Sequence, residues 1–497
     1  MKVRVFENIE RWGNQLPHPS LLFVYLCGLV LITSSVSFWL GLNSIHPVTG
    51  ESITAVNLIS QHGLGLILEN TVSNFTNFSP VGTVLIAILG IGIAEQSGLI
   101  AATLKVSLLK APHSLLTFII VLLGVLSSLA ADAGYVVLIP LAGIVFYNAG
   151  RNPIAGIAAA FAGVSGGYSA NLMIGPIDAI LSGISTEAAQ LINSQATVSI
   201  AANYYFMAAS TLFISTVCWW VTEYWLIPRL AKSHTKNSIQ QITANANSPL
   251  NSHEKKGLIA AGFFSVAFIL VTLLGLLPAE GFLKNTGDPS ILTSPFIKGI
   301  VTVISLYAAV AGIIYGKISG SIKANGDIIH YLESSMGTMA GYLVLMFFAA
   351  QFVSYFAWSQ LGIIGAIQGA TFLESLKLPQ HILMLGLIII AAGINLFIGS
   401  ASAKWALLAP IFVPMLMLVG IEPAATQLAF RIGDSSTNII TPLMPYFGVV
   451  VAFVQKYEPK AGMGTIMAAM LPYSIALLVT WSFLLVCWLM LGLPLGI

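Results

Sequence analysis

Long apolar runs separated by short polar segments dominate the chain. Seven of these runs are close to the roughly 20 residues that a helix needs to cross a bilayer. They predict full-length transmembrane helices at residues 20–42, 81–104, 201–226, 257–277, 297–315, 336–356 and 465–491. The first run is too long for a signal peptide and lacks a small-residue cleavage site, so we expect it to be a retained helix.

Two further apolar stretches, 114–148 and 382–419, are interrupted near their middles by small and polar residues. As one helix, either would be over 50 Å long, at 1.5 Å per residue. Each separate arm would be about 20 Å long, which is shorter than the ~30 Å hydrocarbon core. We therefore predict two re-entrant hairpins, with tips at 127–134 and 395–404. A single tilted crossing in place of each hairpin is the alternative.

After each hairpin comes a helix that starts at a proline, Pro153 or Pro423, and then meets Gly, Ser, Asn and Pro residues. Irregular backbone at membrane depth is tolerated only where protein buries it or it lines a polar cavity. We predict discontinuous crossings at 153–187 and 423–455. The predicted fold is an all-α polytopic membrane protein with nine transmembrane helices and two re-entrant hairpins.

The two halves of the chain are related in sequence. A shift of about 270 residues preserves the order of a series of matching positions. It places Trp405 on Tyr135, Pro410 on Pro140, Pro423 on Pro153, Gly433 on Gly163 and Ser435 on Ser165. The repeats would span 1–230 and 257–497, joined by a polar linker at 231–256. An odd number of crossings separates them, which predicts inverted-topology repeats of the alternating-access kind.

Composition and charge agree with this topology. The chain is 57% hydrophobic and 8% charged, against about 25% charged in soluble domains, so a lipid bilayer and not nucleic acid is the expected environment. With the N-terminus in the cytoplasm, fifteen of the twenty basic residues lie inside and only Lys284, Lys298 and Lys377 lie outside. This obeys the positive-inside rule, whereas the single-crossing alternative would export six of the fifteen.

Arg431 and Asp434 stand three residues apart within the second broken helix and so share a face. Arg431 can receive a substrate carboxylate in bidentate fashion, and Asp434 can bind a cation or proton. The alternative is a mutually neutralising structural pair. The equivalent first-half residues are Phe161 and Val164, and this asymmetry favours a functional role.

Oxygen donors gather near both predicted breaks. Asp178 follows the first break, where a carboxylate can ligate a cation or take up a proton. Hydroxyl, amide and freed backbone oxygens suit sodium at half-helix ends. The candidate sodium ligands are Asn171, Asp178, Asp434, Ser436 and Asn438. Capping of the broken helices explains the same residue types.

The hairpin tips carry the remaining candidates. Ser402, Lys404 and Trp405 lie at the second tip, and Asp132 lies at the first. Trp405 could stack on an aromatic substrate and Lys404 could attract an anion. The alternatives are ordinary packing for Trp405 and a carboxylate partner for Lys404.

Catalytic signatures do not support an enzyme. Residues 163–167 match G-x-S-x-G, but a nucleophile elbow needs a strand-turn-helix setting. All eight histidines lie outside the apolar spans or at their edges, and the chain has no H-E-x-x-H and no Walker A motif. Without a nucleotide motif, we expect no cofactor and transport driven by an ion gradient, either sodium or protons.

Three segments resemble the AbgT family of p-aminobenzoyl-glutamate transporters: ERWGNQLPHP at 10–19, GGYSAN through PID at 166–178, and FRIGDSSTN at 430–438. The resemblance implies a dimeric protein of the bacterial inner membrane with nine helices and two hairpins. It also implies uptake of p-aminobenzoyl-glutamate or efflux of sulfonamide antimetabolites. The family's important positions match Asp178, Asn395, Trp405, Pro423, Arg431 and Asp434.

Together with the resemblance, these patterns predict a cation-coupled secondary transporter of aromatic amide or dicarboxylate-bearing metabolites, with efflux of sulfonamides as the competing physiological role. A sodium-coupled dicarboxylate carrier of similar architecture is the alternative substrate class. A channel-like protein that does not cycle is the alternative mechanism.

Overall fold

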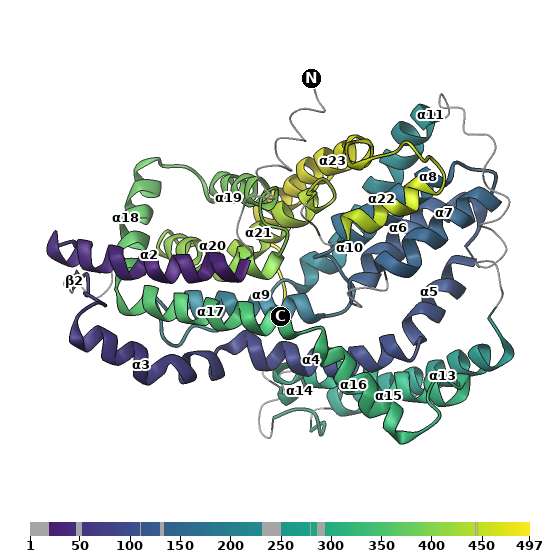
Figure 1. The fold of residues 1–497 in the computed structure, drawn as a ribbon, viewed down its shortest axis with the longest axis horizontal. Coiled ribbons are helices and arrows are strands. Elements are labelled where there is room, and N and C mark those ends of the chain that lie inside the picture. The colour runs from purple at the N-terminus through teal and green to yellow at the C-terminus, as the bar shows by residue number, and fades with distance from the viewer. Residues whose placement is uncertain are drawn as a thin grey trace.

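The computed structural model of the chain describes residues 19–45, 52–109, 111–129, 134–230, 250–278, 280–285, 294–442, 444 and 446–497. These residues are mainly helical (Figure 1). The one sheet among them is a short antiparallel pair, β1 (Asn43–Ile45) with β2 (Ser52–Thr54).

The helices of the first half follow the predicted order. They are α2 (Pro19–Trp39), α3 (Gln61–Thr76), α4 (Ser79–Gln96), α5 (Leu99–Leu109), η1 (His113–Leu115), α6 (Leu116–Leu126), η2 (Ser127–Leu129), η3 (Gly134–Leu138), α7 (Ile139–Asn148), α8 (Pro153–Phe161), η4 (Ala162–Gly166), α9 (Pro176–Ala189), α10 (Tyr204–Val221), η5 (Thr222–Leu226) and α11 (Ile227–Leu230). Of these, η3, η4 and η5 are π-helical segments.

The second half repeats much of this order. Its helices are α13 (Ser252–Leu276), α14 (Pro295–Lys298), α15 (Ile300–Ser319), α16 (Asn325–Gly337), α17 (Ala340–Trp358), α18 (Leu361–Ser375), α19 (Gln380–Asn395), α20 (Ala401–Leu418), α21 (Pro423–Asn438), α22 (Phe447–Gln455) and α23 (Met463–Met490).

The chain is a polytopic membrane protein. In its described part, eight helices are long and apolar enough to cross a membrane, or nine if the bent pair Leu99–Leu108 and His113–Leu126 forms one span. The eight include α20, which the sequence assigns to a hairpin arm. The predicted number of crossings and the inverted orientation of the repeats therefore stay predictions.

The predicted span at 81–104 is too long. Helix α4 ends at Gln96, and Gly98 then adopts a left-handed backbone with φ of +86°. Glycine reaches this conformation without steric cost. The chain leaves the helix there and starts the separate helix α5.

The stretch predicted as the second hairpin has the expected interruption, and that of the first lies partly outside the described residues. Helices α19 and α20 are separated by residues 396–400, close to the predicted tip. In the first half, α6 and η2 precede the tip and η3 and α7 follow it. The tip at 130–133, which includes Asp132, lies outside the described residues, as do residues 1–18 and most of the predicted linker.

Equivalent glycines bring the first arm of each predicted hairpin against the helix that follows it. A Cβ atom added at Gly163 would lie 2.4 Å from the backbone oxygen of Val121 in α6. A Cβ atom added at Gly433 would lie 2.4 Å from the backbone oxygen of Ile388 in α19. Both contacts require glycine, so the sequence match between these residues corresponds to the same packing in the two halves.

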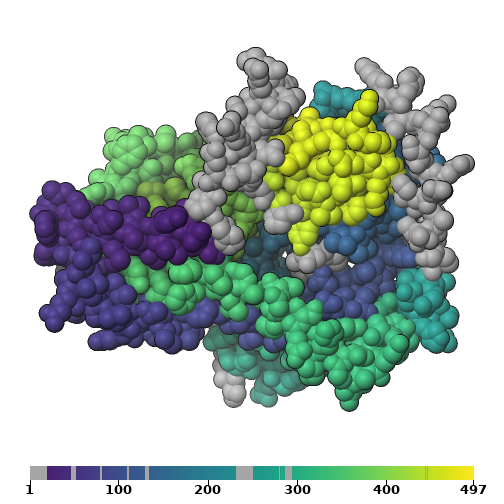
Figure 2. All heavy atoms as spheres, in the orientation of Figure 1, coloured from purple at the N-terminus to yellow at the C-terminus, as the bar shows by residue number. Residues whose placement is uncertain are grey.

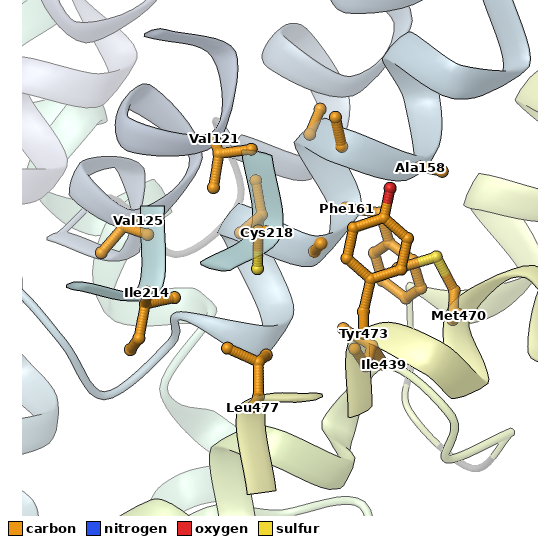
Figure 3. Packing of buried hydrophobic residues seen from close by; sticks show 14 of the residues in the cluster. Val121, Val125, Ala158, Phe161, Ile214, Cys218, Ile439, Met470, Tyr473 and Leu477 are labelled. Carbon is orange, nitrogen blue, oxygen red and sulfur yellow. The ribbon is translucent and has the colours of Figure 1, made fainter. Parts of the chain in front are cut away.

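The main hydrophobic core joins the two halves. Figure 3 shows residues of α6, α8 and α10 meeting Ile439 and residues of α23. Two buried hydrogen bonds connect α10 and η5 to α23. The Tyr473 hydroxyl lies 2.6 Å from the Thr222 hydroxyl, and the Trp481 indole donates to Ser210 Oγ at 2.8 Å. On the face drawn in Figure 2, the yellow C-terminal helices accordingly lie against the blue first half.

Candidate functional site

Helix α21 lies at the centre of the site, and every residue from Ala425 to Asn438 is buried. Contrary to the sequence-based expectation, the helix is regular through 433–438, and the break comes after Asn438, where residues 439–442, 444 and 446 are described as turns, bends or irregular backbone. The hydroxyls of Ser436 and Thr437 donate to backbone oxygens four residues earlier, Ile432 and Gly433. Such bonds satisfy polar side chains within a helix, so the polar run does not interrupt it.

Arg431 joins α21 to α9 and to residues 167–175, the irregular stretch between η4 and α9. Its Nη2 lies 2.7 Å from Asp178 Oδ1 and donates to the backbone oxygen of Ser169 at 2.6 Å. The Arg431 side chain is 1% exposed and that of Asp178 is 12% exposed. The ion pair therefore bridges the two halves of the chain at a nearly buried position.

Asp178 also holds the start of α9. Its Oδ2 accepts a hydrogen bond of 2.8 Å from the Gly175 backbone N–H. A carboxylate in the first turn of a helix is favourable because it satisfies a free N–H and faces the positive end of the helix dipole. The capping role and the ion pair with Arg431 thus coexist on one side chain.

Asp434 lies one turn after Arg431 and pairs with Lys404 of α20, not with Arg431. The Lys404 Nζ also donates to Asn395 Oδ1, at the end of α19. Both Lys404 and Asn395 are fully buried. The sequence alternative of an internal Arg431–Asp434 pair is therefore wrong: each residue pairs with a partner from another element.

Asn395 organises the second cluster. Its Nδ2 lies 2.6 Å from the Asp434 backbone oxygen, 2.8 Å from Thr437 Oγ1 and 2.9 Å from Asn438 Oδ1. With the amide nitrogen directed at α21, the amide oxygen is directed at Lys404. The tip of the second hairpin is thereby fixed against the centre of α21.

Four buried polar atoms of α21 have no hydrogen-bond partner among the described residues: Arg431 Nε, Ser435 Oγ and both carboxylate oxygens of Asp434, of which Oδ1 is ion-paired with Lys404. An unpaired buried donor or acceptor costs about 1–3 kcal/mol, and more when the group is charged. Such atoms gather within little more than one turn of the helix. They mark a position that can accept a polar ligand.

Trp405 has a packing role in this structure. It is fully buried, and its ring stacks on Phe430 with centroids 4.6 Å apart. Its Nε1 donates to Ser185 Oγ at 2.9 Å and lies 3.2 Å from the Leu181 backbone oxygen. The indole therefore fills the space between α9 and α21 and offers no free face to a substrate in this conformation.

The other predicted residues lie at three different places: Ser402 at the second predicted tip, Pro423 at the start of α21, and Asn171 beside Asp178. Ser402 lies 3.2 Å from Ser400, oxygen to oxygen, at the second hairpin tip. Pro423 opens the first turn of α21, more than two helical turns before Arg431. Asn171 donates to Ser128 Oγ at 2.9 Å and accepts from the Met173 backbone N–H.

Sequence reasoning missed a buried polar chain beside Trp405. Ser185 Oγ donates to Gln427 Oε1 at 2.7 Å, and Gln427 Nε2 donates to Asn203 Oδ1 at 3.0 Å. Asn203 in turn donates to the Ala424 backbone oxygen at 2.9 Å. The available signal was the spacing of Gln427, which stands four residues before Arg431 and so lies on the same helix face.

The space beside Asp178 is small. A cavity of about 10 Å³ is lined by Ser169, Asn171 and Tyr204, among others. That volume holds roughly one water molecule, whereas small-molecule sites typically enclose about 300–1,000 Å³. This cavity beside the Arg431–Asp178 pair is therefore too small for a substrate in this structure.

A larger cavity of about 420 Å³ lies elsewhere and is lined by residues that include Lys105, Glu254 and Tyr315. None of the predicted site residues borders it. We place the site at α21 because charged and unpaired polar atoms converge there.

The chain is similar to known transporters over nearly its whole length. The model of the "AbgT putative transporter family" matches residues 4–497. The p-aminobenzoyl-glutamate transport protein of Escherichia coli strain K12 is 37% identical over 490 residues, covering 98% of this chain and 95% of that protein.

Two solved structures share the fold. The YdaH transporter of Alcanivorax borkumensis, described as having an unusual topology, is 48% identical with a TM-score of 0.92, covering 97% of this chain and 100% of that one. MtrF of Neisseria gonorrhoeae, described as illuminating a class of antimetabolite efflux pumps, is 45% identical with a TM-score of 0.91, covering 97% of both chains.

Proposed function

The chain belongs to the AbgT family of transporters, and on that premise we propose that it is a cation-coupled secondary active transporter of aromatic, dicarboxylate-bearing metabolites of the p-aminobenzoyl-glutamate kind. Sulfonamide antimetabolites are the second substrate class, since MtrF is described with antimetabolite efflux pumps. Either uptake or efflux is compatible with this proposal. Family members are transporters and not enzymes, in agreement with the absence of catalytic signatures in the sequence.

The observation that carries the proposal is the state of Arg431. Its Nη2 is engaged by Asp178 and Ser169, while its Nε is buried and has no acceptor among the described residues. A guanidinium with a free N–H in a dry environment is suited to a carboxylate, which it binds through charge-assisted hydrogen bonds. We assign Arg431 as the residue that receives a substrate carboxylate.

Substrate entry requires this region to open. The cavity beside Asp178 has room for about one water molecule, so an aminobenzoyl group needs a different arrangement of the two halves. The ion pair between Arg431 and Asp178 joins those halves, and an incoming carboxylate would compete with Asp178 for the guanidinium. Binding would thereby be linked to separation of the halves, as alternating access requires.

We propose that the coupling ion binds at Asp178. Asp178, once released from Arg431, is free to take up sodium or a proton. The oxygens of Asn171 and Ser169 lie beside it in the same small cavity. These are the hard oxygen donors that sodium takes at half-helix ends.

The remaining elements of the proposal are a homodimer in the bacterial inner membrane with the N-terminus in the cytoplasm. The charge bias of the sequence supports this orientation. A sodium-coupled dicarboxylate carrier is the alternative in substrate class, and it would transport dicarboxylates that lack an aromatic ring.

The direct test is uptake of labelled p-aminobenzoyl-glutamate into proteoliposomes, with a sodium gradient and a proton gradient imposed separately. A carrier should saturate, show counterflow and stop when the driving gradient collapses. Flux that does not saturate and shows no counterflow would contradict the proposal in favour of a channel. Faster transport of a simple dicarboxylate would favour the alternative carrier.

The Arg431→Gln variant tests the residue assignment. Loss of a hydrogen bond to a charged group costs about 1.5–3 kcal/mol, so the KM for p-aminobenzoyl-glutamate should rise roughly 10- to 100-fold. A sulfonamide without the glutamate carboxylates should be affected less. Arg151→Gln is the matched control, because Arg151 pairs with Glu223 away from α21. Equal effects of the two variants would contradict the assignment.

A further inference from the structure

Lys404 occupies an unusual position for an ammonium group. It lies in the first turn of α20, is fully buried, and contacts both Asp434 Oδ1 and Asn395 Oδ1. A buried lysine costs several kcal/mol unless its charge is compensated. The carboxylate of Asp434 compensates it here.

The atoms around the ammonium resemble the ligands of an alkali cation. Asp434 offers a carboxylate, of which Oδ2 has no hydrogen-bond donor among the described residues, and Asn395 offers an amide oxygen. Carboxylate and amide oxygens are the donors that hard cations take from proteins. Asn395 is held in the orientation that presents its oxygen, because its Nδ2 is directed at Asp434 O, Thr437 and Asn438.

The charges are present at only one of two related positions. The shift of 270 that superposes Gly433 on Gly163 superposes Lys404 on Gly134 and Asp434 on Val164. Those first-half residues are also neighbours, since a Cβ atom at Gly134 would lie 2.9 Å from Val164 Cγ1. The packing between hairpin and helix therefore does not need a charged pair. The second half has a charged pair, Lys404 and Asp434, at a contact that is uncharged in the first half.

We propose that the Lys404 ammonium is a tethered cation that takes the place of sodium beside Asp434. This inference rests on the proposed cation coupling and narrows it: in this conformation the Asp434 side of the site carries its own positive charge. Sodium from solution would then bind only at the Asp178 side of the site. Of the predicted sodium ligands, Asp434 and Asn438 serve the lysine cluster.

The proposal predicts that sodium stabilises a variant in which Lys404 is replaced by a neutral residue. In Lys404→Met, a side chain of similar length carries no charge, and Asp434 is left as a buried carboxylate without a counter-ion. Such a stranded charge is strongly destabilising. A sodium ion that binds between Asp434 and Asn395 would relieve this, and ligand binding to the folded state raises its stability.

The test uses the full-length protein in detergent, purified in sodium chloride and then exchanged into either sodium chloride or choline chloride at equal ionic strength. The readouts are the apparent Tm and the number of ²²Na⁺ ions bound per chain. Lys404→Met should melt several degrees higher in sodium than in choline and bind one more sodium per chain than the wild type. Lys404→Arg should behave as the wild type does.

Two controls isolate the Asp434 position. The double variant Lys404→Met/Asp434→Asn has no stranded charge and should lose the additional sodium response. Lys298→Met makes the same substitution at an exposed lysine and should respond to sodium as the wild type does.

Equal stability of Lys404→Met in the two salts, or no additional bound sodium, would overturn the inference. Failure of Lys404→Met to fold even in sodium, while the double variant folds, would overturn it as well, because sodium would then not replace the ammonium. Binding is measured here without transport. Failure of the proteoliposome experiment would therefore contradict the proposed function and not the properties of this site.

Discussion

Replacement of Trp405 distinguishes a packing role from contact with substrate. The indole is fully buried, stacks on Phe430 with centroids 4.6 Å apart, and donates to Ser185 Oγ at 2.9 Å. Because protein groups surround the ring, we expect its substitution to lower stability first. An effect on transport should follow only from the loss of folded protein.

The magnitude follows from these contacts. Truncation of a fully buried tryptophan to alanine costs about 3–5 kcal/mol. The stacked ring pair contributes about 0.5–1.5 kcal/mol of this beyond buried area, and the indole hydrogen bond about 1 kcal/mol. Trp405→Phe keeps an aromatic ring against Phe430 and loses the hydrogen bond, so its cost should be near 1–2 kcal/mol.

Trp481 is the matched control. It is also fully buried, and its indole donates to Ser210 Oγ at 2.8 Å, but it packs in the core between α10 and α23. The assay is the apparent Tm at a fixed scan rate in one detergent, because membrane proteins often unfold irreversibly. We expect parallel losses for Trp405→Phe and Trp481→Phe, with larger parallel losses for the two alanine variants.

The transport readout decides the question. With initial rates normalised to folded protein, Trp405→Phe and Trp481→Phe should both leave the KM for p-aminobenzoyl-glutamate within about twofold of the wild type. A Trp405→Phe variant with wild-type stability and a KM raised tenfold or more, beside an unaffected Trp481→Phe, would refute the packing assignment. The indole would then contact substrate in another conformation.

Three further expectations concern the close packing at Gly433, the pH dependence of the start of α16, and the ion pair between Glu223 and Arg151. Gly433→Ala should lower the apparent Tm more than Gly393→Ala, because an added Cβ meets a backbone oxygen of α19 at 2.4 Å in the first case and open space in the second; equal Tm values would contradict this close approach. Backbone N–H groups that donate to the Asp327 carboxylate hold its pKa below the ordinary 3.8, so the start of α16 should keep this stabilisation above pH 3.8 and lose it as the pH falls through the lowered pKa; amide hydrogen exchange that is equally fast in wild type and Asp327→Asn at neutral pH would argue against it. Glu223→Gln should cost about 1 kcal/mol, because its bonds to Arg151 are partly exposed to solvent; a Tm change as large as that of Trp481→Ala would indicate a larger role.

Many of the helices could be predicted because hydrophobic length and interruption are local properties. The interruption at 396–400 was placed to within a few residues, since Gln380 and Leu418 bound two apolar helices around it. The span at 81–104 was misjudged because hydropathy does not register the left-handed backbone of Gly98. The second break was placed too early because the hydroxyls of Ser436 and Thr437 are satisfied inside the helix.

The composition of the site could be predicted, but not its pairing. Arg431, Asp434, Lys404 and Asp178 stand out as charges in apolar sequence, where each costs roughly 3 kcal/mol. Which of them meet depends on how the hairpin and the first broken segment approach α21, and no local pattern contains that. Trp405 illustrates the same limit, since a buried aromatic residue near a polar tip fits both packing and binding until its neighbours are known.

The contact between α10 and α23 has a consequence for the order of biosynthesis. Thr222 and Tyr473, which share a hydrogen bond in the core, lie 251 residues apart. At a translation rate of about 5–20 residues per second, the ribosome adds Tyr473 roughly 12–50 seconds after Thr222. During that interval Ser210 lacks the indole that it meets in the finished protein. The first half is therefore synthesised well before the helix that buries this face.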